Sequence, residues 1–408
     1  MKMRSLQYIY NKVLAIALIM FATTNAMADD SIGTANRFDS VEISLLTCEP
    51  HNKVYSLYGH TAIRINDKVT GEDLAVNYGV FNSRKKNFVL RFVFGLTDYE
   101  VGIYPFSSFL QEYEHDGRSV TEQVLNLTAD EKQAIIQDIA INAMPENKVY
   151  RYNIFYNNCT TKARDVILKH LKENVEFSER GNRHSFREMT HKYTKNHRWA
   201  QFGNDMLLGV KADAETTQEE QQFLPERLMH DFNDARLVDD NQKKTYLVKK
   251  TNTILPSGGK EAVSEFPLPP IAVCSIIGLA IIILTIIERS KGKYFWLLDA
   301  IICLSFGLVG ILLTAMMFSQ HPTVQLNLQW MMFNPLPLIF GWKAICMRRK
   351  GKKHWLWITW NLMIVGLIFG SFFQHYAEGI TALALSLLLR DMIRNIRIGK
   401  NKLKITSK

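Results

Sequence analysis

Long apolar runs in the last third of the chain constrain this sequence most. Each run is close to the length of helix that crosses about 30 Å of hydrocarbon, whereas residues 29–268 are polar and mixed. The sequence therefore predicts a folded domain outside the membrane, followed by an all-α transmembrane bundle of about five helices. A small cytosolic enzyme and a disordered chain are both excluded. The candidate spans are 269–287, 294–318, 330–347, 354–374 and 379–396.

The segments that connect these spans alternate in charge. Residues 288–293 hold three Lys or Arg, 348–353 hold five and the tail from Arg394 holds six, whereas 319–329 and 374–378 hold none. Basic segments stay in the cytoplasm, so the pattern predicts a multi-pass protein with its N-terminal domain outside and its C-terminus in the cytoplasm. The net charge of +10 comes largely from these segments, so it does not indicate nucleic-acid binding.

The first 28 residues have the pattern of an export signal. A basic start precedes an apolar run from Val13 to Phe21, and Ala26-Met-Ala28 supplies small residues before a cleavage point. The apolar run has about ten residues, half of what a span needs, so we expect cleavage rather than anchoring. The predicted organisation is a signal peptide at 1–28, a periplasmic domain at 29–250, a linker at 251–268 and the transmembrane domain at 269–408.

The exported segment mixes strand and helix patterns. Thr128-Ala-Asp-Glu131 is a capping box that predicts a helix ending near Pro145. A second helical run follows from Lys162, so Cys159 falls where a helix begins. Runs rich in β-branched and aromatic residues predict strands at 41–46, 61–65, 88–94, 120–127 and 149–156.

The position of Cys159 suits a nucleophile. A helix N-terminus favours the thiolate, and its N–H groups can stabilise an oxyanion. A thiol nucleophile needs a base, and His60, at the start of a predicted strand, is the candidate. Asn77 on a neighbouring strand is the candidate for fixing the His60 tautomer, with Asp73 as its rival.

Three segments around these residues carry a family resemblance. They are 56–64 (SLYGHTAIR), 77–81 (NYGVF) and 152–165 (YNIFYNNCTTKARD). Together they resemble the Lnb-type family of bacterial membrane-bound lipoprotein N-acyltransferases, which have an N-terminal periplasmic domain. The order of His, polar strand residue and Cys also resembles circularly permuted papain-like enzymes of the lecithin:retinol acyltransferase kind. The resemblance implies an α+β permuted papain-like domain, an antiparallel sheet with a nucleophile helix, ahead of the bundle.

The resemblance also implies a reaction at the outer face of the cytoplasmic membrane. A phospholipid would donate an acyl chain to Cys159, and the α-amine of a diacylglyceryl-cysteine lipoprotein would attack the resulting thioester. His60 would serve as base and then as acid and base, and the reaction requires no metal or cofactor. We expect Asn158 and Tyr58 to support the oxyanion and Arg64 to contact substrate.

Polar residues at membrane depth are further candidates for substrate contact. His321 and Asn327 lie in the segment predicted outside the cytoplasm, and Asn334 precedes Pro335 within the third predicted span. Polar partners are also needed where proline breaks a helix, so these residues have a structural alternative.

Two other functions remain open from the sequence. The same His–Cys pair could serve an exported thiol amidase or peptidase acting on cell-wall peptide. Alternatively, Cys48 and Cys159, the two cysteines of the exported domain, could form a disulfide in that oxidising compartment. The protein would then be a non-catalytic sensor on a membrane anchor.

Overall fold

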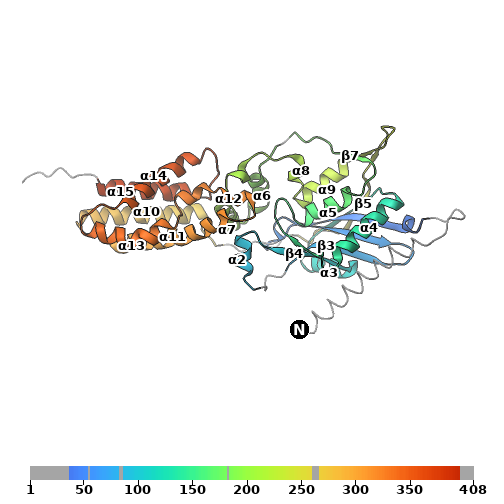
Figure 1. Cartoon of the computed structure of the whole chain (residues 1–408), viewed down its shortest axis with the longest axis horizontal. Coiled ribbons are helices and arrows are strands. Elements are labelled where there is room, and N and C mark those ends of the chain that lie inside the picture. The colour runs from blue at the N-terminus through green and yellow to red at the C-terminus, as the bar shows by residue number, and fades with distance from the viewer. Residues whose placement is uncertain (1–35, 54–55, 82–85, 182, 260–265, 396–408) are drawn as a thin grey trace, which may run out of the picture. The chain divides into compact units, whose positions relative to one another are not determined.

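The computed structural model describes residues 36–53, 56–81, 86–181, 183–259 and 266–395 (Figure 1). The predicted signal peptide lies outside the described residues. The chain divides into two compact units. The first, here called the thiol unit, contains the described residues between 36 and 196 and between 214 and 259. The second, here called the bundle unit, contains residues 197–213 and 266–395.

The thiol unit is built on a seven-stranded antiparallel sheet in the order β10-β5-β1-β2-β3-β4-β6. A second, three-stranded sheet has the order β7-β8-β9. The α+β fold class is as the sequence predicts. The strands are β1 (Val41–Cys48), β2 (His60–Asp67), β3 (Asp73–Val80), β4 (Asp98–Pro105), β5 (Val120–Leu125), β6 (Val149–Arg151), β7 (Asn174–Glu176), β8 (Arg236–Val238), β9 (Lys244–Tyr246) and β10 (Val248–Leu255).

Apolar residues cover both faces of the large sheet. Along β1, Ile43 and Leu45 belong to one buried cluster, whereas Leu46 and Cys48 belong to another, because successive side chains of a strand point to opposite faces. The first cluster includes residues of α4 and α5, and the second includes residues of α3. The sheet is thus a rigid, two-sided scaffold for residues at its strand ends.

Helices of the thiol unit follow the expected signals with one exception. The capping box at Thr128 forms as predicted and opens α4. Residues 88–94, predicted as a strand, instead form a short helix with exposed apolar side chains, because a brief apolar run does not distinguish the two structures. The helices are α2 (Phe88–Val93), α3 (Phe106–His115), α4 (Ala129–Ala143), α5 (Cys159–Leu168), α6 (Phe186–Thr194), α8 (Gln218–Gln221) and α9 (Pro225–Asp234), with a 3-10 turn η1 (Arg37–Ser40).

The bundle unit contains a helix at each of the five predicted spans. Two of them, α10 and α11, are long and apolar enough to cross a membrane, and α14 is apolar but shorter. The third predicted span is interrupted, because short turns precede α13 and it begins only at Leu336. The helices are α7 (Arg198–Leu207), α10 (Pro270–Ser290), α11 (Trp296–Met317), α12 (Pro322–Gln325), α13 (Leu336–Arg349), α14 (Trp355–Gly370) and α15 (Ile380–Asn395), with 3-10 turns η3 (Val210–Asp213) and η4 (Leu328–Met331).

The segment 197–213 belongs to the bundle although it lies between parts of the thiol unit in sequence. Phe202, Met206 and Leu207 of α7 pack against the apolar core of the bundle. The backbone N–H of Gly209 donates to Thr323 O at 2.8 Å. The chain therefore contributes to the bundle in two separate stretches.

A network of buried charges joins helices of the bundle. Asp299 of α11 accepts hydrogen bonds from Arg390 at 3.0 Å and Arg394 at 3.0 Å, both of α15. Glu288 of α10 pairs with the same two arginines, and Arg348 of α13 reaches Asp299. Every one of these charged groups has an oppositely charged partner within the network.

Candidate active site

Cys159 is the first residue of α5, and the residue before it shapes the helix start. The Asn158 side chain accepts hydrogen bonds from the N–H groups of Thr160 and Thr161, both at 2.9 Å. Its amide nitrogen donates to Ile154 O and Phe223 O, both at 2.8 Å. The hydrogen-bonding capacity of the Asn158 amide is thereby used, so Asn158 caps the helix and holds Cys159 in place.

The N–H group of Cys159 itself is not used by this cap. Among the described residues it has no hydrogen-bond partner. An N–H group at a helix N-terminus carries partial positive charge, and this one belongs to the residue that carries the thiol. It is therefore placed to donate to an oxyanion formed on an atom bonded to the Cys159 sulfur.

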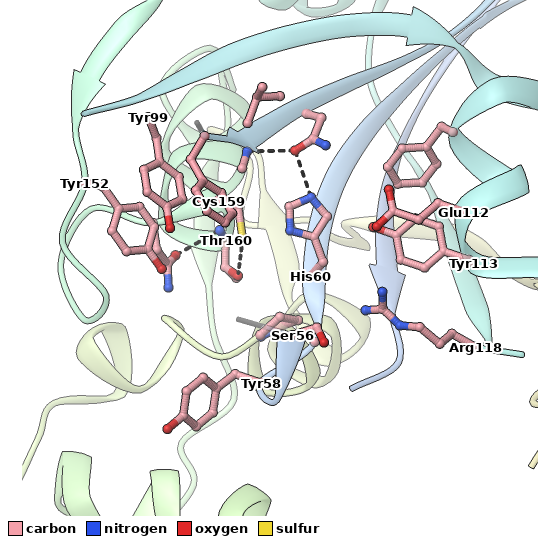
Figure 2. A pocket seen from close by; sticks show the side chains of 18 of the residues that line it. Ser56, Tyr58, His60, Tyr99, Glu112, Tyr113, Arg118, Tyr152, Cys159 and Thr160 are labelled. Carbon is pink, nitrogen blue, oxygen red and sulfur yellow. Dashed lines mark hydrogen bonds between the residues drawn. The ribbon is translucent and has the colours of Figure 1, made fainter. Parts of the chain in front are cut away.

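His60 and Asn77 meet on adjacent strands beside Cys159. His60 opens β2, and the His60 Nε2–H donates to Asn77 Oδ1 at 2.9 Å. Asn77 Oδ1 also accepts from the Gly79 N–H at 2.7 Å, which orients the amide. With its Nε2 proton held by Asn77, His60 presents a Nδ1 lone pair. Figure 2 shows the His60 ring beside the Cys159 side chain.

The His60 ring lies so close to the backbone of β3 that position 79 has no room for a side chain. The pairing of Ile63 with Val76, continued along β2 and β3, puts Gly79 opposite His60. A Cβ at Gly79 would lie 2.5 Å from His60 Cε1 and 3.2 Å from its Nδ1. The backbone of β3 thus forms one wall against the imidazole and limits its rotation.

The electrostatics of the pair favour an ionised sulfur. Burial raises the pKa of the Cys159 thiol, but the charge of His60 and hydrogen bonds from His60 and the Thr61 N–H outweigh burial and bring the pKa to about 7. Burial lowers the pKa of His60, but the interactions with Cys159 and Asn77 prevail and raise it. Each group stabilises the charged form of the other, as a thiolate–imidazolium pair does.

Cys48 lies near this pair but differs from Cys159 in chemistry. It ends β1 directly opposite His60 in the sheet register, and both cysteines are free thiols. Its side chain is 1% exposed, and burial raises its pKa to about 12 despite a hydrogen bond with Tyr113. Cys48 is therefore a protonated packing residue, and the disulfide considered from the sequence is not formed in this structure.

A pocket of about 550 Å³ opens over Cys159, His60 and Asn77, and aromatic side chains line much of it. Tyr99 and Tyr152 stack with ring centroids 3.9 Å apart, on the side of Cys159 away from His60 (Figure 2). Burial and the proximity of Tyr99 and Cys159 raise the pKa of Tyr152 well above its usual value, so its hydroxyl remains a neutral donor. The pocket also contains Arg118 and Glu112.

The sequence analysis missed most of these lining residues. Tyr152 lies in a segment that carried the family resemblance, but its spacing indicated no role. Tyr99, Glu112 and Arg118 come from β4, α3 and the turn after α3. The register of the strands and the packing of α3 bring them to the pocket, so no local pattern could have identified them.

Two predicted site residues have other roles in the structure. Arg64 lies outside the residues that line the pocket, and its guanidinium binds Asp73 through two bonds, at 2.7 and 2.8 Å, and Glu122 at 2.8 Å. Asp73, the rival to Asn77, is therefore a partner of Arg64. Tyr58 lines the pocket, but its ring packs edge-on against Tyr193 at 6.0 Å and points away from the sulfur (Figure 2).

The three polar candidates near the membrane belong to the bundle unit. Asn327 donates to Met206 O at 2.8 Å and accepts from Gln374 at 2.9 Å. Asn334 accepts from the N–H of Leu336, the first residue of α13, at 3.1 Å. His321 precedes α12, and its Nδ1 is buried without a hydrogen-bond partner among the described residues. The two asparagines satisfy backbone groups where helices are interrupted, the structural alternative named above.

Comparison with known proteins agrees with this two-part organisation. Residues 29–192 match the family model described as the Lnb N-terminal periplasmic domain, and residues 261–402 match that of the Lnb transmembrane domain. Searches of curated proteins and of solved structures gave no match. The two matched segments together cover most of the chain, in the order predicted from the sequence. The chain therefore belongs to the Lnb family, as a membrane protein of a lipoprotein-processing family with a periplasmic N-terminal domain.

Proposed function

We propose that this protein is a lipoprotein N-acyltransferase that carries the acyl chain on Cys159. The observation that supports this most is the arrangement of Cys159, His60 and Asn77, with the thiol pKa at about 7. A thiol whose pKa is lowered toward neutral pH is a better nucleophile because more of it is thiolate, and an aromatic pocket beside it suits an acyl chain.

In the first half-reaction, His60 Nδ1 takes the proton of the Cys159 thiol. The thiolate attacks the ester carbonyl carbon of a phospholipid, and the oxyanion accepts a hydrogen bond from the Cys159 N–H. The intermediate collapses with cleavage of the bond to the glycerol oxygen. That oxygen takes the proton from His60 and leaves as a lysophospholipid, and the acyl chain remains as a thioester on Cys159.

In the second half-reaction, the α-amine of a diacylglyceryl-cysteine lipoprotein attacks the thioester carbon. His60 accepts a proton from the attacking nitrogen, and the Cys159 thiolate leaves as the amide forms. Transfer of that proton to the thiolate returns the starting state. Asn77 maintains the His60 tautomer through both halves because its carbonyl oxygen accepts from Nε2–H throughout. The same oxyanion donor serves both steps.

The membrane arrangement belongs to this proposal. We propose that the five helices α10, α11, α13, α14 and α15 cross the cytoplasmic membrane and leave the C-terminus in the cytoplasm. The alternation of basic and uncharged connecting segments supports this topology. The bundle would keep the thiol pocket on the periplasmic side, where both the phospholipid and the lipoprotein are found.

The proposal is tested by trapping the acyl-enzyme. Purified protein incubated with phospholipid vesicles but without acceptor should gain the mass of one acyl chain on the peptide containing Cys159, and neutral hydroxylamine should remove it. Added diacylglyceryl-cysteine peptide should take up the chain as an amide. A protein that stays unmodified in vesicles but cleaves cell-wall peptides would instead be the thiol amidase considered above.

A further inference from the structure

Arg118 is a buried cation in the wall of the thiol pocket. Its side chain is 5% exposed and lines the same pocket as His60 and Cys159. Figure 2 shows the guanidinium directed toward the His60 side of the pocket. Its charge is near enough to lower the pKa of His60, although burial and the thiol act more strongly. The pocket therefore has a fixed positive charge besides the reacting pair.

The guanidinium of Arg118 has unused hydrogen-bonding capacity. Its Nε donates to Glu49 O at 2.7 Å, and its plane lies over the Tyr113 ring at 4.5 Å. Its Nη2 is buried and has no hydrogen-bond partner among the described residues. No carboxylate of a described residue forms an ion pair with Arg118. A buried charged donor without a partner costs free energy. Because this donor faces the pocket, it is available to an anionic group that enters there.

Glu112 provides the opposite charge in the same pocket. It belongs to α3, is exposed, and lines the pocket that Arg118 lines. It forms no ion pair with Arg118 or with another described residue. Figure 2 shows both side chains on the side of His60 that faces away from Cys159. The pocket thus offers a buried cation that can bind an anion and an exposed carboxylate that can bind a cation, both across His60 from the nucleophile.

We propose that Arg118 and Glu112 form the headgroup subsite for a zwitterionic phospholipid donor. Arg118 binds the phosphodiester through Nη2, and Glu112 binds the ammonium of an ethanolamine headgroup. The donor's ester carbonyl lies at Cys159, so the lysophospholipid that leaves in the first half-reaction departs with the headgroup. This inference rests on the proposed acyl transfer and names the donor class that the pocket selects.

The test measures the initial rate of Cys159 acylation, by intact mass, with three donors in otherwise identical vesicles. The donors are phosphatidylethanolamine, phosphatidylglycerol and diacylglycerol. We expect Arg118→Gln to lower the rate with both phospholipids by at least about tenfold, because a charge-assisted hydrogen bond is lost, and to lower the rate with diacylglycerol by less than about threefold. Glu112→Gln should lower the phosphatidylethanolamine rate to that of phosphatidylglycerol, and Arg118→Lys should restore part of the phospholipid rate.

Competition with soluble compounds separates a headgroup site from a general anion site. Phosphoethanolamine should slow acylation of the wild type more than inorganic phosphate does, and this difference should vanish in Glu112→Gln. Equal inhibition by the two compounds would overturn the role of Glu112. An unchanged melting temperature should accompany each variant, and Glu112→Gln, at an exposed residue, tests the subsite even if Arg118 variants fold poorly.

The outcomes distinguish this subsite from the proposed function. Equal losses in Arg118→Gln with all three donors would make Arg118 a positioning residue for His60 and overturn the subsite. Unchanged rates in Arg118→Gln would also overturn it. A wild-type protein that forms no acyl-enzyme with any donor contradicts the proposed acyl transfer itself.

Discussion

The charge network of the bundle and the pocket of the thiol unit hold buried charge in opposite ways. In the bundle, Asp299 and Glu288 are fully engaged by Arg390, Arg394 and Arg348. In the thiol unit, the pocket contains a buried guanidinium with an unpartnered nitrogen and a Cys159 N–H without a partner among the described residues.

The paired charges of the bundle serve stability, whereas the unpartnered donors of the pocket serve chemistry. A paired network inside a low-dielectric bundle fixes which helices are neighbours, because removing one member leaves an uncompensated charge. Unpartnered donors contribute little to folding, but they are ready for charge that arrives with a substrate or develops during reaction. Substitutions in the two clusters should therefore affect different measurements.

The largest expected effect is on catalysis at Cys159. Cys159→Ser should reduce acyl transfer by at least about 10³-fold, because a serine hydroxyl stays protonated near pH 7 and is a far weaker nucleophile than a thiolate in a site arranged for sulfur. Lipoprotein N-termini from cells that express the variant, read by mass spectrometry, should lack the amide-linked acyl chain.

Cys48→Ala is the matched control for that substitution. It removes the second thiol of the same unit from a packed interior, so a loss of about 1 kcal/mol of stability is expected with transfer within a few-fold of wild type. Equal loss of transfer in both variants would contradict the assignment of Cys159 as the nucleophile.

A substitution in the buried charge network of the bundle should lower the stability of the protein. Asp299→Asn removes a charge that Arg390 and Arg394 share, and we expect the free energy of unfolding in detergent to fall by about 3–5 kcal/mol. Ser290→Ala, at an exposed hydroxyl of the same region, is the control and should change little. Under conditions where the variant remains folded, the alkylation rate of Cys159 should match wild type. A changed rate would show that the two clusters are energetically linked.

A substitution that displaces the His60 ring should lower the acylation rate by an intermediate amount. Gly79→Ala would put a methyl group 2.5 Å from His60 Cε1, so the ring must move, and a shift of about 1 Å can cost about 100-fold in rate. Gly181→Ala, where an added Cβ meets nothing within 4 Å, is the control in the same unit. Acylation at the wild-type rate in Gly79→Ala would show that the position of the ring is not critical.

The smallest effect concerns the pH profile of the thiol. Since the pKa of Cys159 is lowered to about 7, its alkylation rate should rise as the pH increases through about 7 and be lost as the pH falls below that value. His60→Ala should move the midpoint upward, because burial then acts without the opposing imidazolium. At pH 7 we expect alkylation more than about tenfold slower in that variant. A midpoint near 9 in the wild type would contradict the thiolate–imidazolium pair.

Local sequence patterns predicted the helices and strands of this fold better than they predicted the contacts between them. The capping box at Thr128 followed from short-range signals, and the structure confirms it. The α+β class, which the family resemblance implied, is also observed. The run 88–94 was misassigned because apolar composition alone does not separate a short helix from a strand. The third predicted span was too long at its start, since polarity around Asn334 marks a break in the helix that hydropathy averages over.

The site residues that could be predicted from the sequence were also those with local signals, whereas those brought in by distant contacts were missed. Cys159 was identifiable because a helix start can be read from its neighbours, and His60 and Asn77 stood in distinctive segments. Arg118 and Glu112 were not, because only strand register and the packing of α3 bring them to the pocket. That the Asn158 amide has no capacity left for an oxyanion could not be seen from the sequence, because one acceptor of its amide nitrogen is the backbone oxygen of Phe223, which is distant in sequence.

The stretch 197–213 has a practical consequence for anyone who wishes to isolate the periplasmic part. Three junctions connect the two units, near residues 196, 213 and 264. A proteolytic nick at any one of them would not release a soluble fragment, because α7 would stay docked in the apolar core of the bundle. A protein shortened to the periplasmic part would instead carry Phe202, Met206 and Leu207 without their packing partners. Such a fragment should require detergent until α7 is replaced by a polar connection.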